Sequence, residues 1–167
     1  STFRKWASAL VLASVAAFAG CSQIDTGNVG VSSTLGKVNL EELPPGVYQT
    51  FAQTIREVSV KEHTLPIENL NPKTKDNITM KDIDLDVRYM VNPGKVADLA
   101  SRLAGDLTET SERGVFIVGH NYVTRHAREA VYDAISEFDA GTIHLKRDEL
   151  GALIVKNLQA KLDKDSG

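Results

Sequence analysis

Three aspartates at alternate positions form the densest group of residues that could do chemistry in this sequence. They are Asp82, Asp84 and Asp86, and in a β-strand their carboxylates would lie on one face. Carboxylate oxygens suit hard cations, but a calcium loop also needs a central glycine for its sharp turn, and none accompanies these residues. We therefore interpret the three aspartates as the solvent-exposed face of a half-buried strand, and we predict no metal site.

The histidines do not have the spacing of a zinc site. His120 and His126 are six residues apart, and His63 and His144 are isolated in the sequence. Two histidines must be four residues apart on a helix to bind one zinc ion from the same face. We expect all four to be surface or boundary residues.

The sequence also lacks a nucleophile motif and a phosphate-binding loop. No Gly-x-Ser-x-Gly elbow occurs, and the single cysteine follows an apolar N-terminal run. Gly30 and Gly36-Lys37 are separated by five residues where the phosphate loop has four, and Val38 stands where that loop has Ser or Thr. The sequence therefore predicts a protein that is not an enzyme and that uses no cofactor.

The charge balance excludes a nucleic-acid-binding surface. The chain has 19 Lys and Arg against 22 Asp and Glu. Because Arg4 and Lys5 precede Cys21, the balance from Cys21 onward is 17 minus 22, or −5. Phosphate backbones are bound by clustered Lys and Arg, and no such cluster occurs. With one cysteine, an internal disulfide is impossible.

The aspartates belong to the clearest strand signal in the chain. Every odd position from Ile83 to Val91 is apolar, whereas Asp84, Asp86 and Arg88 between them are polar. The alternation slips by one residue at Lys81-Asp82, which predicts a bulge or tight connection there. The turn at Lys75–Asn77 could fold this strand back on a preceding one, for which residues 58–65 are the nearest candidate.

The other elements follow from similar patterns. We expect strands and turns at residues 29–38, 47–51 and 55–65, with Pro66 ending the last strand. A short helix at 95–103 and a polar loop at 105–114 come next. An amphipathic helix at 121–138 follows, with Glu129, Asp133 and Glu137 on its solvent side or on a docking face, and Thr142 could cap a second helix. The apolar face of this second helix comprises Leu150, Leu153, Ile154, Leu158 and Leu162. Strands followed by helices predict an α+β fold, with a small, largely antiparallel sheet packed against C-terminal amphipathic helices.

The N-terminus resembles a bacterial lipoprotein signal. Arg4-Lys5 precedes an apolar run at residues 6–18, which is shorter than the ~20 residues of a membrane-spanning helix. Residues 18–21 (Phe-Ala-Gly-Cys) resemble the lipoprotein cleavage box, although Phe18 stands where Leu is usual. We expect a signal peptide at 1–20, lipid attachment at Cys21 and a tether at 21–28. The body would then lie outside the cytoplasm, and Ser22 is similar to the outer-membrane-sorted form.

The order of several short motifs resembles the SPFH (band 7, prohibitin–stomatin) family. The first group of matching residues is Gly27, Gly30, Val31, Gly36, Lys37, Pro45, Gly46, Val47 and Tyr48. The second group is Thr74, Lys75, Asp76, Asp84, Val87, Tyr89 and Val91, and Arg147–Leu150 follows in the helical region. The resemblance covers residues 27–162, and we expect one such domain at 29–164. Two features depart from the family pattern: a lipid replaces the usual membrane helix, and the final strand and long coiled coil are missing, so we expect a domain truncated at its C-terminal end.

The resemblance implies a membrane-associated scaffold or adaptor that forms homo-oligomers and contacts an unknown membrane protein or protease complex. We predict an interaction surface on the two strands around residues 58–65 and 78–91. Its candidate residues are Val58, Val60, Asp84, Asp86 and Arg88. The alternative is a monomeric envelope lipoprotein that binds a ligand or inhibits another protein. This alternative predicts a defined pocket between sheet and helices.

Overall fold

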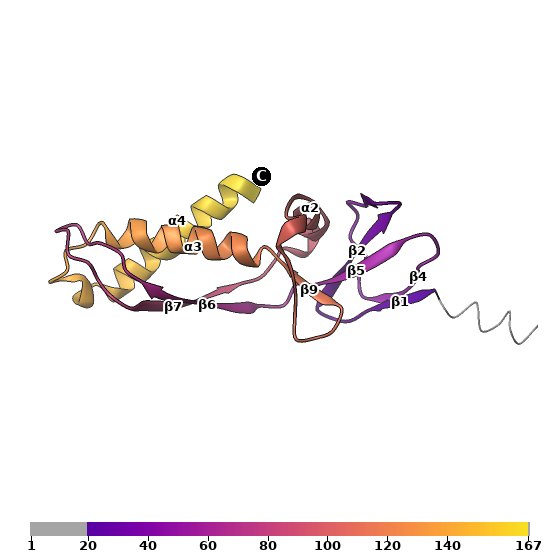
Figure 1. The fold of residues 1–167 in the computed structure, drawn as a ribbon, viewed down its shortest axis with the longest axis horizontal. Helices are drawn as coiled ribbons and strands as arrows, with labels where there is room; N and C mark the ends of the chain where they lie inside the picture. Colours follow the sequence, from indigo (N-terminus) through magenta and orange to yellow (C-terminus); the bar gives the residue numbers. More distant parts are fainter. Residues whose placement is uncertain (1–19, 167) are drawn as a thin grey trace, which may run out of the picture. The chain divides into compact units, whose positions relative to one another are not determined.

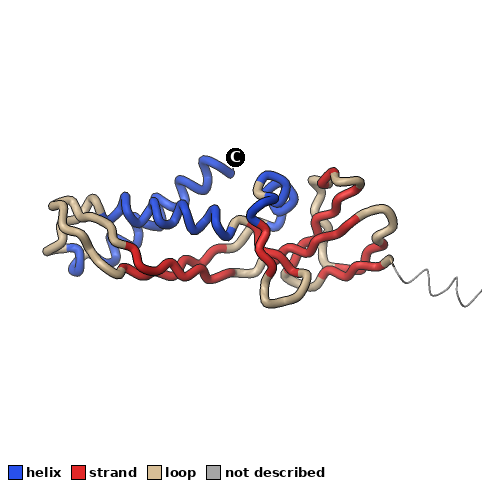
Figure 2. Tube along the Cα trace, viewed as in Figure 1, coloured by secondary structure: helices blue, strands red, loops and turns tan. Residues whose placement is uncertain are grey.

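The computed structural model describes residues 20–166, which form two compact units. The first unit comprises residues 20–61, Asn92–Arg102 and Glu109–Ile117, and the second comprises Glu62–Val91, Leu103–Thr108 and residues 118–166. The apolar run that we interpret as part of a signal peptide lies outside the described residues. The fold is a mixture of helices and mainly antiparallel strands (Figures 1 and 2), which confirms the predicted α+β class.

The first unit is built around the strand pair β2 (Asn28–Thr34) and β5 (Thr54–Ser59), which are antiparallel. They belong to a sheet with the order β3-β2-β5-β9-β8. The bounds of the other three strands are Lys37–Val38 for β3, Val115–Val118 for β9 and Leu107–Glu109 for β8. A separate antiparallel pair joins β1 (Cys21–Ile24) to β4 (Gly46–Gln49).

A short helix covers the sheet of the first unit. A 3₁₀ turn, η1 (Pro93–Lys95), leads into α2 (Val96–Arg102), which packs against β2. Val96 and Ala97 are fully buried there. The backbone N–H of Ala97 donates to Glu42 Oε1 at 3.2 Å, so this carboxylate binds one of the free donors at the start of α2.

The second unit consists of a β-hairpin and two helices. The hairpin joins β6 (His63–Leu70) to β7 (Ile83–Tyr89), and α3 (His120–Ile135) and α4 (Arg147–Ser166) lie on one side of it (Figure 1). Two 3₁₀ turns, η2 (Ala104–Asp106) and η3 (Ile143–Leu145), precede the helices. The buried core comprises Leu65, Ile67, Leu70, Val87, Val123, Ala127, Val131, Ile135 and Ile143.

The first turn of α3 is capped from elsewhere in the second unit. Gly119, with φ 82°, precedes the helix and offers no capping side chain. Instead, the Asp106 carboxylate accepts hydrogen bonds from the backbone N–H groups of Asn121 at 3.0 Å and Tyr122 at 2.8 Å. A negative charge at this position also complements the positive end of the helix dipole.

The alternating strand is confirmed, and its predicted partner is correct only in part, because His63–Leu65 of the candidate segment pair with β7 and residues 58–62 do not. β7 pairs with β6, whereas the candidate segment 58–65 is divided, because β5 ends at Ser59 and β6 begins at His63. Pro66, expected to end a strand, lies inside β6 opposite Asp86. Proline is tolerated in a two-stranded hairpin because each strand is an edge strand. Where the proline nitrogen faces away from the partner strand, no ladder hydrogen bond is lost.

Three further predictions need correction. Residues 105–114, expected to be a polar loop, include part of η2 and all of β8, and β9 was not expected at all. Residues 21–24, expected to be part of a tether, form β1. Thr142 does not cap the second long helix, which begins at Arg147; its hydroxyl instead donates to the carbonyl oxygen of Asp139 at 3.3 Å.

Candidate interaction surface

The described part of the chain contains no group of residues arranged for metal binding. Between residues 20 and 166, no three His, Cys, Asp or Glu side chains lie close enough together to share an ion. The three aspartates near β7 are exposed, as expected for a solvent face. Within the same residues, no helix has the length and apolar character needed to cross a bilayer.

The predicted interaction surface is not a single surface within either unit. Val58 lies in β5 between β2 and β9 and is 0 % exposed. A central strand has a neighbouring strand on each side, and a side chain on the covered face of the sheet is shielded from solvent. Val60 is half-buried in the first unit. Asp84, Asp86 and Arg88 are exposed on β7, in the second unit. Val58 is therefore a core residue, and the other four residues do not form one patch with it.

The outward face of the β6–β7 hairpin is polar. Thr64 lies opposite Arg88 and Pro66 lies opposite Asp86 in the ladder, and all four side chains are exposed. A β-bulge follows Ile67, where Asn69 adopts a φ of 59° and its N–H donates to Asp84 Oδ1 at 2.9 Å. Asp84 thus stabilises the bulge, and it is exposed on this face together with Asp86 and Arg88.

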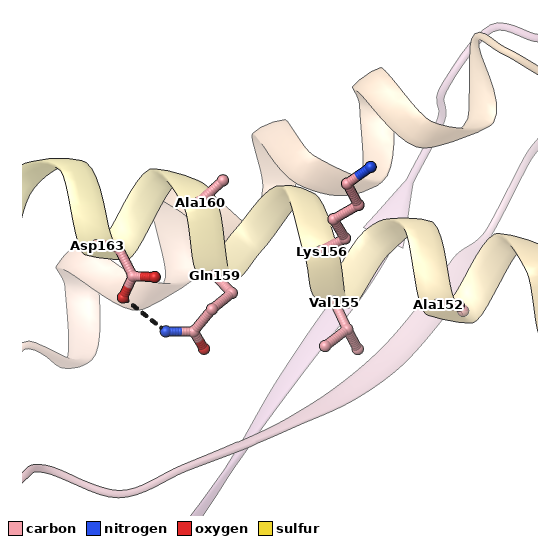
Figure 3. Close-up of a pocket in the computed structure, with 7 residues that line it drawn as sticks. Ala152, Val155, Lys156, Gln159, Ala160 and Asp163 are labelled. Carbon is pink, nitrogen blue, oxygen red and sulfur yellow. Dashed lines mark hydrogen bonds between the residues drawn. The ribbon is translucent and has the colours of Figure 1, made fainter.

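A second exposed surface runs along α4. Leu150, Ile154, Leu158 and Leu162 pack against the core of the second unit. The opposite side of the helix lines an open hollow (Figure 3), and Val155 on this side is 66 % exposed. We call this side the α4 face; its residues are Gly151, Ala152, Val155, Lys156, Gln159, Ala160 and Asp163.

The α4 face is lined by one helix alone, so no other described segment covers it. Only one contact joins its side chains in Figure 3: Gln159 Nε2 donates to Asp163 Oδ1 at 2.8 Å. The sequence pattern did not reveal this face, because the periodic leucines mark only the side that packs on α3. The sequence feature that could have indicated this face is Val155, an apolar residue outside that periodic set.

α4 is also held to α3 by an ionic contact. Lys161 Nζ lies 3.1 Å from Asp133 Oδ2 and 3.5 Å from Glu129 Oε2. The hydrogen bond that Lys161 donates to Asp133 is the main cause that raises the pKa of Lys161. Glu129 and Asp133, two of the three acidic residues expected on a solvent side or docking face, therefore contact the second helix.

The fold and its surfaces can be compared with known proteins. A family model described as "SPFH domain / Band 7 family" matches residues 22–166. This range includes every element of both units except the first residue of β1. No protein with a curated description matches the chain.

Proposed function

The chain belongs to the SPFH domain / Band 7 family, and on this basis we propose that it is a membrane-associated scaffold that assembles with copies of itself and organises or regulates membrane proteins. Members of this family are generally membrane-associated and non-enzymatic, and they generally self-assemble. The partner is a membrane protein or protease complex at the same membrane.

The observation that carries self-assembly is the α4 face. It presents Ala152 and the 66 % exposed Val155 beside Gly151 and Ala160. Small side chains let a second helix approach closely, and the exposed valine provides apolar area that association would remove from water. No other described segment lines this face, so Val155 and the small residues beside it are open to a second helix.

The charges of the α4 face suit a symmetric contact. Lys156 and Asp163 are its ionisable residues, so the face is neutral overall. A neutral face creates no net repulsion between two copies, and one cation with one anion can pair across a two-fold axis. We therefore assign the face to a second copy of this chain.

Attachment to the membrane is part of the same proposal. Cys21, the proposed lipid attachment residue, is exposed and is the first residue of β1, where it pairs with Gln49. Acyl chains on this thiol would hold the first unit against the bilayer without an intervening linker. The protein would then be a lipoprotein of the bacterial cell envelope with its body outside the cytoplasm, on the outer membrane where one exists. Mass spectrometry of the purified N-terminal peptide would detect diacylglycerol on Cys21.

Light scattering during size-exclusion chromatography of the full chain in mild detergent tests the assembly. We expect a protein mass several times the 18.2 kDa of one chain, and we expect Val155→Lys to lower it. Leu145→Lys is the matched control, because Leu145 is an apolar residue of η3 that is 76 % exposed and lies outside the α4 face. A wild-type mass equal to one chain would contradict self-assembly.

The alternative function, ligand capture by a monomeric lipoprotein, requires a pocket between sheet and helices. The hollow on α4 is lined by a single helix and is open to solvent, so it does not support that function. The same mass measurement separates the two hypotheses.

A further inference from the structure

Two bulky apolar side chains at turns of the first unit are almost completely exposed. Leu35, in the turn between β2 and β3, is 98 % exposed, and Phe51, in the turn between β4 and β5, is 93 % exposed. The two turns contain non-glycine residues in the left-handed region, with φ 50° at Leu35 and 61° at Ala52. Asn and Gly fit such turns better than Leu does, so neither packing nor turn conformation explains a leucine here.

The strand register places both turns at the same end of the sheet. Ser33 of β2 pairs with Thr54 of β5, so the turn after β2 and the turn before β5 leave the ladder side by side. The chain also enters the unit at this end, because Cys21 pairs with Gln49 and the Thr50 N–H donates to the carbonyl oxygen of Gly20 at 2.5 Å. Leu35, Phe51 and the entry of the chain therefore share one end, which we call the entry end.

The entry end lacks acidic residues. Segments 20–23, 32–38 and 49–55 contain no Asp or Glu, and Lys37 is their only basic residue. The opposite end of the β2–β5 ladder begins at the pair Asn28–Ser59 and carries Asp25 and Glu57. Glu57 Oε1 accepts hydrogen bonds there from the Asp25 N–H and from Asn28 Nδ2, both at 2.7 Å. One end of the unit thus carries Lys37 and two exposed apolar residues, whereas the other end carries the charged residues Asp25, Glu57 and Lys61.

We propose that the entry end is a membrane-contact site, at which Leu35 and Phe51 insert into the headgroup region of a bilayer. This inference rests on the proposed membrane association and adds the end of the fold and the residues that touch lipid. Cys21, the proposed lipid attachment residue, is exposed and lies at this end, where it pairs with Gln49. Turns that project outward fit a fluid surface, and Lys37 can reach anionic lipid phosphates while its stem lies among apolar groups.

Tryptophan scanning with brominated lipids tests this assignment. Trp6 is the only tryptophan, so full-length Trp6→Phe is the background into which Leu35→Trp or Phe51→Trp is introduced. Thr26→Trp is the matched control, because Thr26 is exposed in the turn between β1 and β2 at the opposite end. That end is about 17 Å along the ladder from the entry end, at ~3.4 Å per residue. Each protein is mixed with phosphatidylethanolamine–phosphatidylglycerol vesicles that contain brominated phosphatidylcholine, and circular dichroism checks its fold.

We expect the Leu35→Trp and Phe51→Trp proteins to lose emission and shift to the blue with vesicles, and the Thr26→Trp protein to do neither. Flotation of the vesicles reports binding independently. If the protein floats with the vesicles but neither turn position is quenched, the inference is wrong while membrane association stands. If the protein does not float, both fail. Equal quenching in the Thr26→Trp protein would also overturn the inference. So would a blue shift of the Phe51→Trp protein that depends on protein concentration in the absence of lipid, because it would assign the turns to a contact between proteins.

Discussion

Asp76 Oδ1 accepts a hydrogen bond from the backbone N–H of Ala140 at 3.1 Å, although the two residues are 64 positions apart in the sequence. The same oxygen accepts the hydroxyl hydrogen of Thr74 at 2.6 Å, and the Lys75 N–H donates to the carbonyl oxygen of Phe138 at 2.9 Å. The turn at Thr74–Asp76 thus fastens the hairpin connection to the segment between α3 and α4. These hydrogen bonds, first from Thr74 and then from Ala140, lower the pKa of Asp76 below 3.8.

The first prediction concerns the pH dependence of this contact. Asp76→Ala removes both hydrogen bonds and should lower the free energy of unfolding at pH 7. Because the pKa of Asp76 is lowered in the folded state, its contribution is present above the unfolded pKa near 3.8 and is lost as pH falls below it. Urea unfolding at pH 7 and at pH 3 should show a smaller difference from wild type at pH 3. An equal difference at both pH values would contradict the ionic origin, and Asp86→Ala on the exposed strand face is the control.

The second prediction concerns the buried hydroxyl of Tyr89. Burial, assisted by the negative charge of Asp106, raises the pKa of this phenol to about 12. The hydroxyl has no hydrogen-bond partner among the described residues. A buried, unpaired polar group costs about 1–3 kcal/mol, so Tyr89→Phe should leave stability at pH 7 unchanged or raise it by about 1 kcal/mol.

The same substitution should remove a pH effect in the alkaline range. The pKa of Tyr89 is higher in the folded state than its unfolded value of 10.0. Its contribution to the free energy of unfolding is therefore fully present below pH 10 and is lost as pH rises toward about 12. Guanidinium unfolding of the wild type and the Tyr89→Phe variant at pH 7 and pH 11 measures this difference. Tyr132→Phe is the control, because Tyr132 is 41 % exposed and its hydroxyl accepts a hydrogen bond from the Asn71 N–H at 3.2 Å. Greater instability of the Tyr89→Phe variant at pH 7 would show that the phenol has a partner.

The third prediction concerns close packing at Gly30 in β2. A methyl group added there would overlap Ile24 Cδ1 of β1 and lie 3.1 Å from Leu43 Cβ. Overpacking of this kind typically costs about 1–3 kcal/mol, so Gly30→Ala should lower the thermal midpoint. Ile24→Ala combined with Gly30→Ala should recover part of the Gly30→Ala loss, since it removes the overlapping atom. A double variant whose loss equals the sum of the single losses would exclude this overlap as the cause.

The parts of the fold that the sequence predicted are those with regular periodicity. The alternation from Ile83 to Tyr89 located β7, and the three- and four-residue steps of Val123, Ala127 and Val131 located α3. These patterns arise because one face of a strand or helix is buried and the other is exposed to solvent, so apolar residues recur with the period of that element. The turn around Lys75 likewise predicted that β7 folds back on a preceding strand.

The parts that the sequence did not predict depend on contacts between distant segments. β9 has four residues and pairs in parallel with β5, more than 50 positions earlier, so no local pattern marks it. The same limit applies to Val58, whose burial depends on neighbours on both sides, and to Val155, whose exposure depends on where α4 packs. The α4 face and the entry end were therefore visible only in the structure.

The last prediction separates the stability of one chain from assembly at the α4 face. A methyl group added at Gly151, within α4, would contact nothing within 4 Å. Replacing glycine by alanine inside a helix typically stabilises it by about 0.5–1 kcal/mol, so Gly151→Ala should make the single chain more stable. If a second helix approaches this face closely, the same methyl group should weaken association. Thermal unfolding and light scattering on the same protein should then change in opposite directions, and a variant that is more stable and equally associated would place the interface elsewhere on the molecule.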